Sequence, residues 1–311
     1  MRATVTASIA LLGTITIAGC GLGAGPAPSA IHLTVTRDFG ASELPHSGAL
    51  KISGQETDMS LLMRNYSVGT RYGGGFVSSI DGLASGQEAG EPVDWFYYVN
   101  GVEASKGAAA TNVNPGDHVW WDHHDWSQTA DVPAVVGSFP EPFLNGLDGK
   151  RLPVRVECVV VAGYACQTVT ARLRSFNIPA AINQAGSGGA PAILRLLVGP
   201  WIDVAGDLDV ATIASGPRAS GVYARFSRDG HTLTLLDQNG RAARTLDAGA
   251  GLVAATRRDQ DAPVWVITGT DEAGVKLAAR AFQQSALRNH FAVALTAAGQ
   301  ALPVPVGEAH P

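Results

Sequence analysis

The sequence predicts an α+β protein, in which a small β-grasp-like N-terminal domain precedes a three-layer α/β domain with a mixed sheet. Residues 31–126 contain short β-branched and aromatic runs around a single short helical stretch, which is typical of a small mixed domain. From residue 154 onward, apolar runs alternate with stretches of helical spacing, as in a sheet covered by helices. With 311 residues and 46% hydrophobic content, the chain can bury two such cores.

Changes in composition along the chain divide it into six expected segments. Gly, Pro and Ser cluster before the first strand, and a proline-punctuated apolar stretch separates the two domains. The expected segments are a lipoprotein signal peptide (1–19), a flexible tether (20–30), the N-terminal domain (31–128), a connector (129–150), the α/β domain (151–296) and a flexible tail (297–311).

The N-terminus has the pattern of a bacterial lipoprotein signal. A short positive start precedes the apolar run Ala7–Ile17, which is too short to span a membrane, and Ile17-Ala18-Gly19-Cys20 resembles a lipobox. Cys20 is therefore predicted to carry the lipid that anchors the chain to the extracytoplasmic face of the cell membrane. The alternative is an ordinary secretory signal in which the cysteine occurs by chance.

Two cysteines remain after Cys20. Cys158 and Cys166 are close in sequence, and in an oxidising compartment such a pair is expected to form a disulfide. It would close a short loop between a strand and a helix, and we assign it no redox role. The alternative is a pair of free buried thiols.

The stretch Asp94–Trp126 holds four of the six tryptophans and three of the eight histidines. It reads as two strands, and because side chains alternate along a strand, both faces of each are aromatic. A surplus of Trp and Tyr on one face is typical of a ligand-binding surface, although the same face could instead pack on the second domain. The residues predicted to contact a ligand are Trp95, Tyr97, Tyr98, Trp120, Trp121 and Trp126.

The second of these strands also offers metal ligands. Asp122 and His124 are two residues apart, so their side chains point to one side at a spacing of about 6.5–7 Å. His118 lies on the same face, and imidazole with carboxylate suits zinc, cobalt, nickel or iron. The alternative is a solvated strand end, since no distant cluster supplies further ligands.

Residues of the N-terminal domain resemble a known family. Leu61-Leu62, Phe76 with Ile80, Trp95 to Gly101, and Gly116-Asp117 to Trp121 are similar to a bacterial domain of unknown function related to the C-terminal domain of transcobalamin. The resemblance covers the first third of the chain and implies the β-grasp-like fold. In transcobalamins the related domain helps to enclose a corrinoid, but the large helical partner domain has no counterpart here.

In the second domain, apolar runs at 154–161, 192–198, 252–256 and 263–268 are expected to be strands. Thr270-Asp271 is expected to cap a helix whose apolar stripe includes Val275, Ala279 and Phe282. Gly269-Thr270-Asp271 could alternatively hold an anion at the helix N-terminus. We recognise no family for this domain.

Several motifs of catalysis are absent from the sequence. It contains no Gly-x-Ser-x-Gly, P-loop, Gly-x-Gly-x-x-Gly or His-Glu-x-x-His pattern, so we expect neither an enzyme nor a bound cofactor. Asp203, Asp207 and Asp209 suggest paired carboxylates, but no partner acid or nucleophile is identifiable, and we expect them to be solvated. The net charge of −5, without a basic patch, makes nucleic acid an improbable partner.

These observations predict a lipid-anchored extracytoplasmic protein that captures a ligand, with a corrinoid or a transition metal as the leading choice. Its expected partners are the membrane, through the lipid, and an importer. The first alternative is a structural or adhesive module of the cell envelope without a small-molecule ligand. The second is a hydrolase of wall polymers, which would need two carboxylates facing one cleft.

Overall fold

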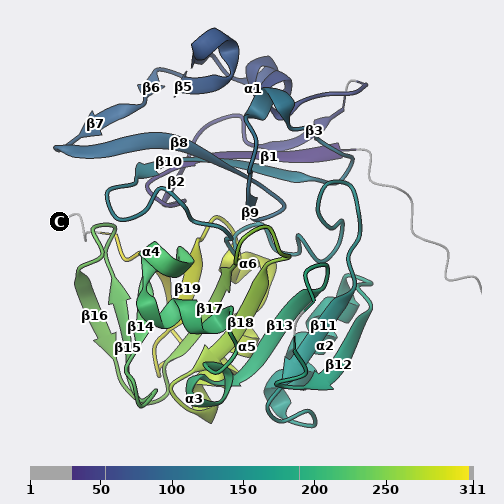
Figure 1. Ribbon diagram of the computed structural model, residues 1–311, viewed down its shortest axis with the longest axis vertical. Helices are drawn as coiled ribbons and strands as arrows, with labels where there is room; N and C mark the ends of the chain where they lie inside the picture. The colour runs from purple at the N-terminus through teal and green to yellow at the C-terminus, as the bar shows by residue number, and fades with distance from the viewer. Residues whose placement is uncertain (1–29, 53, 189, 308–311) are drawn as a thin grey trace, which may run out of the picture.

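The computed structural model describes residues 30–307, apart from residues 53 and 189 (Figure 1). Within them the chain is a mixed α+β protein with two seven-stranded sheets and two three-stranded sheets, which confirms the predicted class. In Figure 1 the N-terminal sheet lies across one end of the larger C-terminal part. Cys20 and the proposed tether up to residue 29 lie outside the described residues.

The N-terminal sheet is built around two long strands. The first strand, β1, runs parallel to β10, and β10 pairs antiparallel with β8, so both aromatic strands are flanked by neighbours. The strands of this sheet are β1 (Ala30–Arg37), β2 (Ser42–Glu43), β3 (Gly48–Lys51), β7 (Gly86–Glu88), β8 (Glu91–Val99), β9 (Val102–Glu103) and β10 (His118–Asp125).

One face of this sheet is covered by the helix α1 (Asp58–Asn65) and by a small sheet of β4 (Val68–Arg71), β5 (Phe76–Ile80) and β6 (Leu83–Ala84). Thr57 and Ser60 form a capping box that starts α1, as the Thr57-Asp58 pattern predicted. Leu61 and Leu62 are fully buried beneath the helix. The short helices η1 (Tyr72–Gly74) and η2 (Ala108–Ala110) complete this layer.

The C-terminal sheet is partly parallel. Its order is β12-β11-β13-β18-β17-β19-β20; the first four strands are parallel, and antiparallel pairing begins between β18 and β17. Its strands are β11 (Val154–Cys158), β12 (Ala180–Gln184), β13 (Leu194–Pro200), β17 (Gly251–Thr256), β18 (Val264–Gly269), β19 (Ala292–Leu295) and β20 (Ala301–Val304).

Two helices, α2 (Tyr164–Ser175) and α5 (Glu272–Ala281), share an apolar core with one face of this sheet. Asp271 caps α5 by accepting a hydrogen bond from the amide of Gly274, as expected. The sulfur atoms of Cys158, at the end of β11, and Cys166, in α2, lie at disulfide distance, with Cα atoms 5.9 Å apart. The short helix α6 (Gln284–Leu287) follows α5.

The opposite face of the sheet belongs to a second core to which both halves of the chain contribute. Phe39, Tyr98 and Trp120 of the N-terminal part lie in it beside Phe291 and Tyr223 of the C-terminal part. The elements on this side are α3 (Trp201–Val204), η3 (Val210–Ser215), α4 (Pro217–Ser220), β14 (Ala224–Phe226), β15 (Leu233–Leu236) and β16 (Ala242–Leu246). The two predicted domains are therefore joined by a continuous core.

The predicted flexible tail is partly wrong. Residues 301–304 form β20, which pairs antiparallel with β19, and Val304 is buried. Pro303 lies within this strand, and an edge strand tolerates proline because one row of its amides faces away from the sheet. In the described part of the chain, no helix is both long and apolar enough to cross a membrane.

Candidate functional site

The aromatic strands are covered on both faces. Trp95, Tyr97 and Trp121 lie in the N-terminal core, whereas Tyr98 and Trp120 are fully buried in the core shared with the C-terminal part. Of the six predicted ligand-contacting residues, Trp126 alone is substantially exposed, at 39%. The expected open aromatic surface is therefore not what the structure contains, because each face of the sheet packs against another layer.

The predicted metal ligands are also engaged within the protein. Asp122 Oδ1 accepts hydrogen bonds from His124 Nδ1 at 2.7 Å and from the amide of Phe39 at 3.1 Å. Its Oδ2 accepts from Thr36 Oγ1 at 2.5 Å and from the amide of Gly40 at 2.9 Å. His118 Nε2 bonds instead to Thr34 Oγ1. Across the described residues no group of three or more His, Cys, Asp or Glu could hold a metal ion, so the expected metal site is not formed.

A cavity of about 640 Å³ lies in the C-terminal part, over one face of the sheet. Arg195 and Leu197 of β13 line it, with Val264 at the start of β18. The segment after α3, from Gly206 to Asp209, borders the cavity, as does the glycine-rich loop that joins β12 to β13. The apolar part of the lining includes Ala185, Ala190, Pro191, Ile193, Val204, Leu208 and Ala262.

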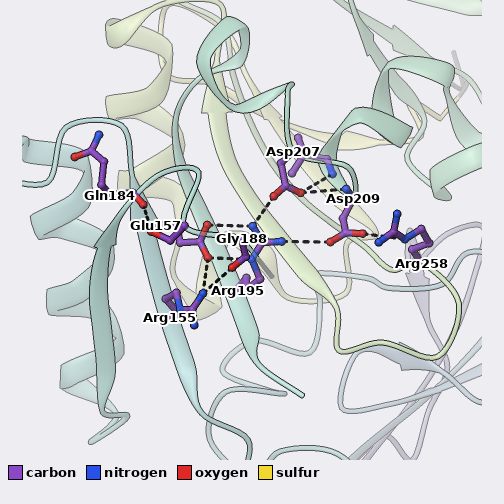
Figure 2. A network of polar contacts seen from close by, with 10 residues as sticks. Arg155, Glu157, Gln184, Gly188, Arg195, Asp207, Asp209 and Arg258 are labelled. Carbon is purple, nitrogen blue, oxygen red and sulfur yellow. Dashed lines mark hydrogen bonds and ion pairs between the residues drawn. The ribbon is translucent and has the colours of Figure 1, made fainter. Parts of the chain in front are cut away.

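Arg195 is the centre of a charged network at this cavity (Figure 2). Its side chain is only 3% exposed, and its guanidinium donates two hydrogen bonds of 3.0 Å to the fully buried carboxylate of Glu157 on β11. The same guanidinium donates to Asp207 at 2.5 Å and to Asp209 at 3.2 Å. Buried charges require such paired geometry, because an unpaired ion in an apolar interior is costly.

Two further arginines complete the network. Arg155 approaches Glu157 at 3.4 Å, and Arg258 approaches Asp209 at 3.3 Å. Burial by itself would raise the pKa of Asp207, but the Arg195 guanidinium outweighs it and lowers that pKa overall. Burial, and then the neighbouring charge of Asp207, raises the pKa of Asp209. The three arginines balance Glu157, Asp207 and Asp209, so the network is neutral as a unit.

The cavity as a whole is acidic. Its lining contains Asp203, Asp207, Asp209 and Asp261 against Arg195 and Arg258, a formal excess of two negative charges. Asp203 is exposed and Asp261 is half-buried. Among the described residues, neither of these two carboxylates has a hydrogen-bond or ion-pair partner. Asp261 lies beside Arg257, on whose guanidinium its negative charge acts, whereas Asp203 has no charged partner among the described residues.

A second cavity of about 410 Å³ lies where the two halves meet. Glu103 and Lys106 of the N-terminal part line it, together with Asp148 of the connector and Arg257 of the C-terminal part. Burial, and then contact with Asp131, raises the pKa of Glu103 to about 8. This cavity is smaller than the one beside Arg195, and the two acidic and two basic residues of its lining balance in formal charge.

Glu157 and Arg195 were not among the residues predicted to form a site. Both sit inside runs that were read simply as apolar strands, 154–161 and 192–198. The charged residues within these runs, Arg155 and Glu157 in the first and Arg195 in the second, were the available signal, since charged residues are rarely buried without a partner. Asp207 and Asp209 were noticed, but their partner Arg195 was not.

Comparison with known families places one domain in the chain. Residues 56–125 match a domain of unknown function, DUF4430. The matched region runs from just before α1 to the end of β10, so it includes both aromatic strands and none of the residues that line the larger cavity. A search of curated proteins finds no match to the chain.

Proposed function

We propose that this chain is a lipid-anchored extracytoplasmic binding protein that takes up a small organic cation in the cavity beside Arg195. The observation that carries the proposal is the cavity itself, because about 640 Å³ falls within the range of small-molecule sites, roughly 300–1,000 Å³. Apolar walls with a few convergent charged groups are also typical of such sites.

The charge of the lining supports a cationic ligand. Arg195 has its hydrogen bonds directed at Glu157, Asp207 and Asp209, so it supports the wall and does not attract an anion. Asp203 and Asp261 are unpaired within the described residues, and they favour a ligand that brings its own positive charge. The apolar walls favour a ligand with a hydrocarbon body beside that charge.

The proposed location at the extracytoplasmic face of the membrane rests on the sequence. The lipobox at Ile17-Ala18-Gly19-Cys20 supports an anchor on Cys20, and the cysteine pair at 158 and 166 suits an oxidising compartment. An anchored binding protein at the membrane surface is suited to deliver its ligand to an importer. The transcobalamin-like residues of the first domain favour a role in ligand capture, although a corrinoid is larger than the drug-sized molecules such a cavity holds.

Calorimetric titration of the full-length protein tests this proposal. The probes are choline, spermidine and phenethylamine, with cobalamin and Zn²⁺ as the ligands expected from the aromatic strands. We expect saturable binding of at least one cation, at least tenfold weaker in Asp261→Asn and unchanged in Asp259→Asn. Asp259 lies in the same turn but does not line the cavity. Binding of cobalamin or Zn²⁺ alone would contradict the choice of ligand.

The buried aromatic rings favour a second candidate, a structural module of the cell envelope. In that case the rings only join the two halves, and the cavity holds no ligand. Absence of binding by every probe, in a protein that unfolds cooperatively, would favour this alternative.

A further inference from the structure

The strand β12 is an open edge of the C-terminal sheet. It pairs with β11 on one side only, and Figure 1 shows it as the outermost strand of that sheet. Ala181, Ile182 and Gln184 are exposed, Ile182 at 44%. At the other edge, Pro303 lies within β20, and Pro305 follows the strand. Proline and charge are the usual protections of a sheet edge, and β12 (AAINQ) has neither.

The outward-facing amides of β12 can be assigned from one hydrogen bond. The amide of Ala185 donates to the carbonyl of Cys158 at 2.9 Å, so the backbone of residue 185 faces β11. Successive residues of a strand direct their amide and carbonyl groups to opposite edges. Residues 181 and 183 therefore also face β11, whereas Ala180, Ile182 and Gln184 direct their amide and carbonyl groups away from it. The outward carbonyl of Gln184 accepts one hydrogen bond, from Ser187 Oγ at 2.6 Å.

We propose that β12 pairs with β12 of a second copy of this chain, antiparallel and about a two-fold axis at Ile182. Ile182 is the central residue of the five-residue strand, so this register places it opposite itself. Each Ile182 exchanges both of its backbone hydrogen bonds with the other. Ala180 pairs with Gln184, whose carbonyl has a second lone pair beside the one that accepts from Ser187 Oγ. The outward residues are thus the set that an antiparallel two-fold pair requires.

The side chains are compatible with the same partner. No residue of β12 is charged, so two copies approach without repulsion between like charges across the strands. Ile182 is in register with Val156, which is fully buried beneath α2, and neighbouring residues of paired strands share a face. The two Ile182 side chains therefore contact each other beside the α2 helices, and each removes exposed apolar surface from water.

The size of the contact sets its strength. A five-residue strand buries far less than the roughly 800 Å² per partner of a stable interface, so the pairing is weak and concentration-dependent in solution. An anchor on Cys20, which belongs to the proposed function, would raise the local concentration in the membrane and favour the pair. The edge geometry itself does not depend on that anchor.

Cysteine cross-linking tests the partner and the register together. In an antiparallel hydrogen-bonded pair, opposed Cα atoms lie about 5.5 Å apart, which a disulfide can span. With Cys20→Ser in every variant, the full-length protein carrying Ile182→Cys should form a covalent dimer under mild oxidation. Ala180→Cys, on the same edge, should not, because the two-fold register separates the two copies of that residue by several positions. Ile202→Cys, an exposed isoleucine on α3, should not cross-link either.

A proline variant separates pairing from folding. Ile182→Pro removes a donor that faces solvent, so it leaves the hydrogen bonds to β11 intact and the protein folded. We expect the association constant from analytical ultracentrifugation to fall at least tenfold in this variant and to stay unchanged in Ile202→Pro. A monomeric wild-type protein at all concentrations, or equal cross-linking of all three cysteine variants, would overturn the proposal.

Discussion

The ring of Phe291 meets the ring of His124 edge-on, with their centroids 5.4 Å apart at an interplanar angle of 87°. Phe291 precedes β19 in the C-terminal part, whereas His124 lies in β10 of the N-terminal part. His124 itself is stacked between Phe39 at 4.5 Å and Phe96 at 4.4 Å. A histidine that appeared available to a metal is thus part of the contact that joins the two halves.

Phe291→Ala should strongly destabilise the junction between the halves. The ring is 3% exposed and also contacts Tyr98 and Trp120, so its removal leaves a cavity that rigid neighbours cannot fill. We expect a loss of about 3–5 kcal/mol in the free energy of unfolding, measured by urea denaturation. Met63→Ala, on the exposed side of α1, should change it by less than about 0.5 kcal/mol. Equal effects of the two variants would contradict the shared core.

Asp58 should make the protein less stable as the pH rises. Its side chain is fully buried, and burial raises its pKa to about 7 despite the hydrogen bond donated by Trp121 Nε1. The folded state therefore retains a proton that the unfolded state loses above its ordinary pKa of about 4. The resulting penalty is absent below pH 4, grows to roughly 4 kcal/mol by pH 7 and is constant above it.

Asp58→Asn isolates this effect, because the amide stays neutral and can still accept from Trp121. The free energy of unfolding should be higher in the variant than in the wild-type protein at pH 8, and the difference should shrink steadily towards pH 4. Glu103 and Glu141, whose pKa values burial also raises, contribute equally to both proteins and cancel in the comparison. If the difference between the two free energies of unfolding instead grows as the pH falls, Asp58 is not neutral in the folded protein, and the prediction is wrong.

Gly101 and Gly82 form a matched pair for testing the contact between the aromatic hairpin and the connector. Both have a positive φ, +77° and +87°, and each follows a residue that also has one. A Cβ on Gly101 would lie 2.9 Å from the carbonyl oxygen of Val135, whereas one on Gly82 would meet no described atom within 4 Å. Gly82→Ala should cost about 1–2 kcal/mol from backbone strain alone, and Gly101→Ala measurably more. Similar losses in thermal denaturation would contradict the close packing at Val135.

In the charged network beside the cavity, a single substitution should lower the free energy of unfolding, and a second one should restore most of it. Arg195→Met leaves the buried carboxylate of Glu157 with only Arg155 nearby, and we expect a loss of about 3–5 kcal/mol. Adding Glu157→Leu removes the stranded charge, so the double variant should recover most of that loss. Urea denaturation of both variants measures this coupling, and strictly additive losses would show that the two residues act independently.

Local signals in the sequence predicted several elements well. The Thr57 and Asp271 caps located α1 and α5, since a cap and an apolar stripe depend only on nearby residues. The period of two along β8 and β10 correctly indicated two aromatic faces. What covers those faces depends on Phe291 and Tyr223, which lie far along the chain, and no local pattern encodes that contact.

The same limit applies to the cavity. The ion pair between Glu157 and Arg195 joins adjacent parallel strands whose pairing is set by the topology of the sheet. Because the two strands were interpreted as uniformly apolar, Glu157 and Arg195 were not predicted to form a site. The strand β20 lies within the expected flexible tail, and its Pro303 disfavours a central strand but is acceptable at an edge.

Chemical-shift mapping in the isotope-labelled full-length protein, during titration with the tightest-binding cation, locates the binding site. We expect the amides of Leu208, Ala262 and Val264, which line the cavity, to shift with the binding curve, and the indole signals of Trp95, Trp120 and Trp121 to stay fixed. Indole signals that move with the curve while the cavity amides stay fixed would contradict this expectation and return the site to the aromatic strands.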